Sequence, residues 1–190
     1  GIYEMNKDDR DRKNIDEAHY RYWHLGGSVH EGKVTDLEWC VPRFQHAFDR
    51  WALQLGQITG MENLSYIEIT LLNVIRMQDR PKTAASIARQ LNRDDIPNVQ
   101  YGLRKLVRED LCKKVTNTGS KHVAFTVTDQ GKKLTDNYAK VRRQILIEQT
   151  GNIDRIDEKL LEATRLLSML TGLYDEVGRI ASSYSRVDYK

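Results

Sequence analysis

The stretch "DIPNVQYGLRKLVREDL", residues 95–111, decides the fold class. Its apolar residues recur at steps of three and four, so one face of a helix is buried. They are Ile96, Val99, Leu103, Leu106 and Val107. The opposite face carries two amides, a phenol and three cations, namely Asn98, Gln100, Tyr101, Arg104, Lys105 and Arg108. Side chains of these kinds suit base edges and phosphates, whereas a merely solvated helix face usually fills with Glu and Lys.

Two helix signals precede this stretch. In "LSYIEITLLNVIRMQD", residues 64–79, Ser65 is an N-cap and Glu68 stands at the capping-box spacing, so a buried helix follows. In "TAASIARQLNRDD", residues 83–95, Thr83 caps a short helix with small inner residues. The polar turn "NRDD" joins this short helix to the next, which Asp94 or Asp95 can cap. Two helices joined by about four residues predict a helix-turn-helix.

The hydrophobic period changes from 3.6 to 2 after Leu111. The segment "LCKKVTNTGSKHVAFTVT", residues 111–128, predicts two short strands around the turn "NTGS". A β-hairpin directly after such a helix is a wing. It carries Lys113, Lys114 and Lys121 and no acidic residue, which concentrates positive charge in a chain of net charge +3. Lysines also protect exposed strand edges, and both roles can hold together.

Two apolar heptad repeats flank this region. Seven residues from Leu37 to Ile58 alternate in steps of four and three, and we expect their helix to begin near Val41 with Pro42 in its first turn. Before it, Gly26, Gly27 and Gly32 interrupt any helix, so residues 1–36 are expected to form an arm.

The second repeat runs from Ile153 to Tyr184, after a helix that is capped by Thr128 and ends near Gly151. A helix of this length spans on the order of 45 Å, too long for a winged helix to cover, and a second copy of the chain is the simplest partner. We therefore divide the chain into the arm (1–36), an N-terminal dimerisation helix (37–60), a winged helix-turn-helix (61–128) and C-terminal dimerisation helices (129–190).

The order of these elements resembles the MarR family of bacterial winged-helix transcription regulators. The resemblance rests on "LSYIEITLLNVI", on the helix-turn-helix and on "FTVTDQGKKL" after the wing, and it covers roughly residues 41–184. It implies a mostly α fold with a small β-hairpin wing and long N- and C-terminal dimerisation helices. It also implies a homodimer that reads a pseudo-palindromic operator in double-stranded DNA through helix 96–109 and wing 111–127. The half-sites would lie one helical turn apart, or a multiple of that.

The resemblance implies DNA contacts from the polar helix face, the start of the preceding helix and the wing. The Asp-Arg-Arg wing tip common in the family is replaced by "NTGSKH", which leaves Lys121 or His122 to enter the minor groove. The candidate DNA-binding residues are Thr83, Pro97, Asn98, Gln100, Tyr101, Arg104, Lys105, Lys113, Lys114, Lys121 and His122.

Three further interpretations stay open. Phe44, Phe48 and Trp51 line either an effector pocket for a small molecule, as the family often has, or plain core. Cys40, expected near a helix N-terminus that favours a thiolate, is either a redox sensor of a peroxide-responsive repressor or an inert thiol. A winged helix that binds protein rather than DNA is the remaining alternative.

Several classes of protein are not indicated. There is no nucleophile with a base at a recognisable spacing, no phosphate loop and no cofactor motif, so we expect neither an enzyme nor a cofactor. His19, His24 and His30 have no metal-ligand spacing, and we expect no metal. The absence of a long apolar run or an apolar leader predicts a cytoplasmic protein without membrane contact.

Overall fold

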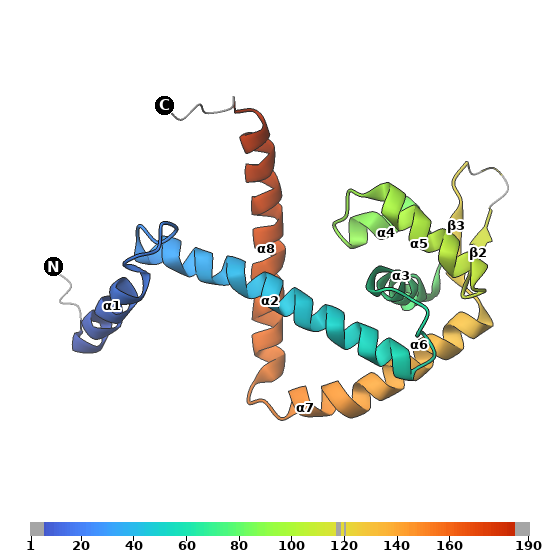
Figure 1. Ribbon diagram of the computed structural model, residues 1–190, viewed down its shortest axis with the longest axis horizontal. Coiled ribbons are helices and arrows are strands. Elements are labelled where there is room, and N and C mark those ends of the chain that lie inside the picture. The colour runs from blue at the N-terminus through green and yellow to red at the C-terminus, as the bar shows by residue number, and fades with distance from the viewer. Residues whose placement is uncertain (1–5, 117–118, 120, 185–190) are drawn as a thin grey trace. The chain divides into compact units, whose positions relative to one another are not determined.

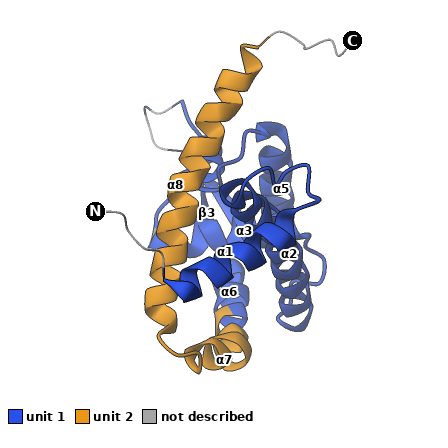
Figure 2. Ribbon diagram, turned by 90° about the vertical axis from the view of Figure 1, so that its left-hand side faces the viewer, with its two compact units in different colours: residues 1–138 blue, residues 139–190 orange. Residues whose placement is uncertain are grey.

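The computed structural model describes residues 6–116, 119 and 121–184. The chain divides into two compact units, Gly1–Tyr138 and Ala139–Lys190 (Figure 2). Both are mainly helical, and the first also holds a small antiparallel sheet, which confirms the predicted fold class. In the part of the chain that the structure describes, no helix combines the length and the apolar content of a membrane span.

The core of the first unit lies among α3 (Tyr66–Arg76), α4 (Ala84–Gln90) and α5 (Ile96–Arg108), which Figure 1 shows grouped beside the sheet. Its fully buried side chains include Ile69, Leu71, Leu72, Ile75, Ile87, Val99, Leu103 and Leu106. The capping box at the start of α3 is confirmed: the Glu68 N–H donates to Ser65 Oγ at 3.3 Å, and the Ser65 N–H donates to Glu68 Oε2 at 3.0 Å. A 3-10 turn, η1 (Met77–Asp79), follows α3.

The turn from α4 to α5 is only partly as predicted. Thr83 caps α4, because its Oγ1 accepts from the Ser86 N–H at 3.1 Å. Asp95 occupies the N-cap position of α5, but its carboxylate caps no backbone N–H. Instead it accepts from Arg93 Nη2 at 2.6 Å and from Asn98 Nδ2 at 3.1 Å. The Asp95 carboxylate is therefore occupied by side-chain donors and not by the backbone N–H groups at the start of α5.

The wing is part of a three-stranded antiparallel sheet of order β1-β3-β2. Its strands are β1 (Lys82–Thr83), β2 (Cys112–Val115) and β3 (Ala124–Val127). Lys114 pairs with Phe125 and Lys113 with Thr126. The sequence did not predict β1, because two residues carry no periodicity. Of the turn predicted at residues 117–120, only Gly119 is among the described residues, with a φ of 100°.

Two helices precede the winged helix, α1 (Lys7–Tyr20) and α2 (Val29–Ile58). The prediction that helix 37–60 begins near Val41 is wrong. Ser28 caps α2 by accepting from the Glu31 N–H at 3.1 Å, so the helix starts well before Pro42, which lies inside it. A proline in a helix interior costs one hydrogen bond, which the remaining bonds of this 30-residue helix outweigh.

The prediction that glycines interrupt all helices of residues 1–36 is also wrong at Gly32. This glycine lies inside α2, and a Cβ there would stand 2.4 Å from Cγ of Tyr20. The Tyr20 hydroxyl donates to Asp36 Oδ2 at 2.6 Å, and Lys33 pairs with Asp16 at 3.0 Å. Gly32 therefore serves close packing of α1 on α2 rather than a break in the chain.

The second unit continues from α6 (Asp129–Arg142), a helix that begins in the first unit. Thr128 Oγ1 caps α6 by accepting from the Gly131 N–H at 3.0 Å, as predicted. A π-helical segment η2 (Arg143–Ile147) and α7 (Glu148–Gly151) extend it to the predicted end near Gly151. The last helix, α8 (Ile156–Ser182), has no buried residue in this single chain.

Candidate nucleic-acid interface

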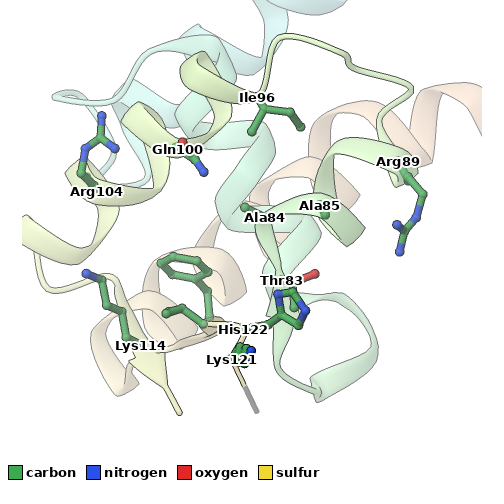
Figure 3. Close-up of a pocket in the computed structure, with 12 residues that line it drawn as sticks. Thr83, Ala84, Ala85, Arg89, Ile96, Gln100, Arg104, Lys114, Lys121 and His122 are labelled. Carbon is green, nitrogen blue, oxygen red and sulfur yellow. The ribbon is translucent and has the colours of Figure 1, made fainter. Parts of the chain in front are cut away.

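A groove of about 790 Å³ lies between the start of α4, the exposed face of α5 and the wing (Figure 3). Helical spacing brings Gln100 and Arg104 to the same side of α5, one turn apart. Strand pairing places Lys114 beside Phe125, across the groove from α5. The lining residues are Thr83, Ala84, Ala85, Arg89, Ile96, Gln100, Arg104, Lys114, Lys121, His122, Val123 and Phe125.

Positive charge dominates this groove. Arg89, Arg104, Lys114 and Lys121 contribute four cations from three different parts of the chain. None of the described residues that line the groove is acidic. Cations gathered along a concave surface raise the local concentration of anions and orient their approach. The groove therefore suits a polyanion, and Gln100 adds an amide that can pair with a base edge.

Six of the eleven candidate DNA-binding residues named from the sequence lie together in this groove. They are Thr83, Gln100, Arg104, Lys114, Lys121 and His122. Pro97, Asn98 and Tyr101 are exposed on α5 but do not line it. The Asn98 amide donates to Asp95, so its remaining amide hydrogen and carbonyl oxygen are left for a ligand.

Lys113, another of the candidate DNA-binding residues, does not line this groove. Successive residues of a strand point to opposite faces, and Lys114 takes the groove side of β2. Lys113 shares the other face with Thr126 and lines a separate hollow of about 190 Å³ beside Arg80 and Lys132. A DNA contact by Lys113 therefore stays a prediction, and it would lie outside this groove.

Lys105, also predicted to contact DNA, does not line the groove either. Its side chain is about one quarter exposed, and its Nζ lies 2.6 Å from Oε1 of Glu68. The same ammonium donates to the carbonyl oxygen of Asn63 at 2.7 Å. Burial acts to raise the pKa of Glu68, but hydrogen bonds from Lys105 and Ser65 outweigh it and hold this pKa below its usual value. The Lys105 ammonium is thus bound by acceptors of the protein itself.

Two groove residues were missed in the sequence. Arg89 lies in the last turn of α4. It stands on the side of that helix opposite the small inner residues, and this position could have predicted that its side chain faces outward. Ile96 was assigned to the core, yet it is half-buried and lines the groove. Apolar side chains at such a position suit thymine methyl groups.

The three aromatic residues proposed for an effector pocket lie on α2. Phe44 and Phe48 stack with ring centroids 6.4 Å apart, and Phe48 meets Tyr66 edge-on at 5.8 Å. Phe44 is 70% exposed and Phe48 is 42% exposed, whereas Trp51 is half-buried. In this single chain Phe44 and Phe48 therefore form a partly uncovered aromatic surface rather than core.

The two cysteines differ in environment. Cys40 is exposed and lies about three turns inside α2, not at its N-terminus. The physical argument for an activated thiol at Cys40, a nearby helix N-terminus, is therefore wrong. Cys112 is buried on β2, and burial raises the pKa of its thiol to about 12, which leaves it unreactive.

Comparison with known proteins agrees with this geometry. Residues 64–131 match the family model described as "Winged helix DNA-binding domain". No curated protein matches the chain in sequence.

Solved structures share the fold over most of the chain. AbfR of Staphylococcus epidermidis is 16% identical with a TM-score of 0.64, over 77% of this chain and 96% of AbfR. MepR of S. aureus, solved as a complex with DNA, is 20% identical with a TM-score of 0.56, over 72% of this chain and 97% of MepR. The MarR family transcription regulator SP03579 is 12% identical with a TM-score of 0.58, over 80% of this chain and 99% of the regulator. At these identities the likeness establishes a shared fold.

Proposed function

This chain has the winged-helix fold of the MarR-family transcription regulators, and on that premise we propose that it is a regulator that binds specific sequences of double-stranded DNA. The observation that carries the proposal is the groove between α4, α5 and the wing, with four cations and no acidic side chain among its described lining residues. The structure of MepR with DNA supports the same use of the fold.

The groove residues divide by chemistry into two roles. Gln100 can pair bidentately with adenine, and Arg104 can do so with guanine, so these two read bases in the major groove. Arg89 on α4 and Lys114 and Lys121 on the wing lie outside the exposed face of α5, and we assign them to phosphates. Thr83, at the start of α4, and His122, in the wing, border the same path.

We further propose that the regulator is a homodimer held by α2 and α8. Every residue of α8 is at least partly exposed in the single chain, although its apolar residues repeat at heptad spacing. Leu160 is 53% exposed, Leu167 is 44% exposed and Val177 is 47% exposed. Apolar surface on this scale usually marks an interface. A symmetric dimer then presents two reading helices to two half-sites of a pseudo-palindrome.

We also propose that a small-molecule effector binds at the aromatic surface of Phe44 and Phe48, beside Trp51. A second copy of the chain covering that surface would turn it into a pocket. A ligand there changes DNA binding only if it has different affinities for the dimer that binds DNA and the dimer that does not.

The experiment that tests this function starts from a library of genomic fragments. Fragments that the protein retains are selected, and each is titrated by gel shift at several salt concentrations against a shuffled sequence of equal length. We expect a preference for the selected fragment and a slope of log affinity against log salt on the order of −4 to −7, as four to eight neutralised phosphates require. Binding that is absent, or equally tight to the shuffled sequence, contradicts the proposal.

A further inference from the structure

The strongest unexplained feature lies behind the groove, on the side of α5 that faces α3. Lys105 Nζ contacts Oε1 of Glu68 at 2.6 Å and Oε2 at 3.3 Å, and it also binds the Asn63 carbonyl at 2.7 Å. The Glu68 side chain is only 5% exposed. One ammonium therefore joins the reading helix to the first turn of α3 and to the segment before it.

Glu68 is itself held in place. Its Oε2 accepts from the Ser65 N–H at 3.0 Å and from the Ser65 hydroxyl at 2.5 Å, which fixes the carboxylate at the start of α3. One turn before Lys105, Gly102 lets α5 approach α3 closely: a Cβ at Gly102 would stand 2.6 Å from Cδ1 of Leu71. The close approach and the ion pair lie on the same side of α5, three residues apart.

Stability alone is a weak reason for such a pair. Removing two charges from water costs about as much as their attraction returns, so a buried ion pair seldom adds net stability. The close contact at Gly102 and the buried side chains of Val99, Leu103 and Leu106 hold α5 against the core, but apolar contacts are non-directional and define the rotation of a helix less sharply than directed bonds do. An ion pair with three directed contacts restricts that rotation.

Rotation matters because the reading groups are directional. A helix with its side chains has a radius of roughly 5–6 Å, so a turn of about 20° moves its outer atoms by about 2 Å. A hydrogen bond to a base edge needs a donor–acceptor distance within a few tenths of an ångström. Arg104 is the residue next to Lys105, and Gln100 lies one turn before Arg104, so their orientation depends on this angle.

We propose that Lys105 and Glu68 are positioning residues that fix the rotation of α5 and thereby the sequence specificity of the groove. Neither touches DNA. The inference rests on the proposed function, because it concerns how the groove distinguishes sequences. It replaces the expectation that Lys105 itself contacts DNA.

The test replaces both partners at once, since removal of one leaves an unpaired buried charge and unfolds many proteins. Glu68→Gln with Lys105→Met keeps the net charge of the chain, so general attraction to phosphate is unchanged. The amide oxygen that Glu68→Gln introduces can still accept from Ser65. The readout is the affinity ratio between the selected fragment and its shuffled sequence. We expect this ratio to fall about tenfold, the worth of one base contact, with unchanged affinity for the shuffled DNA and an unchanged salt slope.

A second measurement separates positioning from a general loss of structure. In the wild type, Gln100→Ala should lower the affinity ratio, whereas in the variant without the ion pair the same change should have little further effect, because Gln100 is already misplaced. Lys105→Arg, which can still pair with Glu68, should retain most of the ratio. Lys13→Gln with Glu17→Gln removes an exposed ion pair of α1, also without change of net charge, and should change nothing.

The outcomes are distinct. This inference is overturned if the variant without the ion pair keeps the full affinity ratio. It is also overturned if Gln100→Ala lowers that ratio as much in this variant as in the wild type. Either result leaves the proposed function intact. A wild type without sequence preference overturns both. If the methionine variant does not fold, Glu68→Gln with Lys105→Gln, whose amides can hydrogen-bond to each other, is judged by the same criteria.

Discussion

Asp110, at the turn from α5 into β2, adopts a left-handed conformation with a φ of 57°. The N–H of Leu111 donates to the Leu106 carbonyl at 2.9 Å, and the N–H of Asp110 donates to the Val107 carbonyl at 3.1 Å. This is the Schellman pattern, in which glycine is the usual residue at the left-handed position. A non-glycine residue there costs about 1 kcal/mol in steric strain, although Asp tolerates the conformation better than most.

Asp110→Gly should therefore stabilise the protein by roughly 0.5–1 kcal/mol. Urea unfolding followed by circular dichroism measures the change. Asp110→Ala removes the same carboxylate but keeps the Cβ, so it should not stabilise. If both variants gain equally, the carboxylate rather than the backbone conformation is responsible.

Asp95, at the start of the reading helix, makes a pH-dependent contribution to the stability of the folded protein. Hydrogen bonds from Arg93, and secondly from Asn98, lower the pKa of this carboxyl from 3.8 to about 2. Because the folded state favours the ionised form, the interaction stabilises the protein above about pH 4 and is lost as the pH falls through about 2. Asp95→Asn should thus be less stable than the wild type at neutral pH, with a difference that shrinks toward pH 2.

Urea unfolding at several pH values between about 2 and 7 tests this expectation. Asp94→Asn is the charge-matched control, since the Asp94 carboxylate makes neither of these hydrogen bonds. A difference between wild type and Asp95→Asn that stays constant over this range would show that the Arg93–Asp95 pair is not responsible.

At the scale of elements, the short strand β2 directs two adjacent lysine side chains to opposite faces of the sheet. Lys114 lines the groove, whereas Lys113 faces away toward Arg80 and Lys132. The alternation of a strand predicts opposite faces, but only the pairing of Lys114 with Phe125 decides which lysine meets the groove.

Lys114→Ala should weaken binding to every DNA sequence alike and reduce the magnitude of the salt slope by about one for each bound protomer. Lys113→Ala removes the same charge from the neighbouring residue and should leave both quantities nearly unchanged. Gel shifts of the two variants at matched salt concentrations make the comparison. Equal losses from both lysines would mean that net charge, not the face of the strand, governs binding.

The sequence-based predictions were most accurate where they depended on residues close together in the chain. The capping box of Ser65 and Glu68 and the caps at Thr83 and Thr128 were correct, because each involves residues within one turn. The start of α2 was wrong, since the long helix outweighs Pro42 and Gly32 packs against Tyr20, which is distant in sequence. β1 was missed because its pairing with β3 is non-local.

At the scale of the whole molecule, the described helices leave apolar residues exposed. No residue of α8 is buried, and several apolar residues of α2 are exposed, among them Val41, Phe44 and Ile58. We expect a helix of 27 residues, about 40 Å long, to pack such a surface against a partner. The proposed homodimer supplies one.

Leu160→Glu with Leu167→Glu places two charges on one face of α8, seven residues apart, and should convert the dimer largely to monomer. Sedimentation velocity at micromolar concentration measures the change. Arg165→Glu alters the net charge by the same amount on the opposite face of the helix and should leave the dimer intact. A wild type that sediments as a monomer contradicts the dimer.

The stretch "DIPNVQYGLRKLVREDL" by itself determined a helix with one buried and one polar face, because a 3.6-residue period is a local property. Together with its flanking caps and the change of period after Leu111, it also determined the winged helix. Only the tertiary structure decided which polar residues meet in the groove. Lys105 turns to Glu68 and Lys113 to the far side of the sheet, because partners distant in sequence fix side-chain directions that periodicity leaves free.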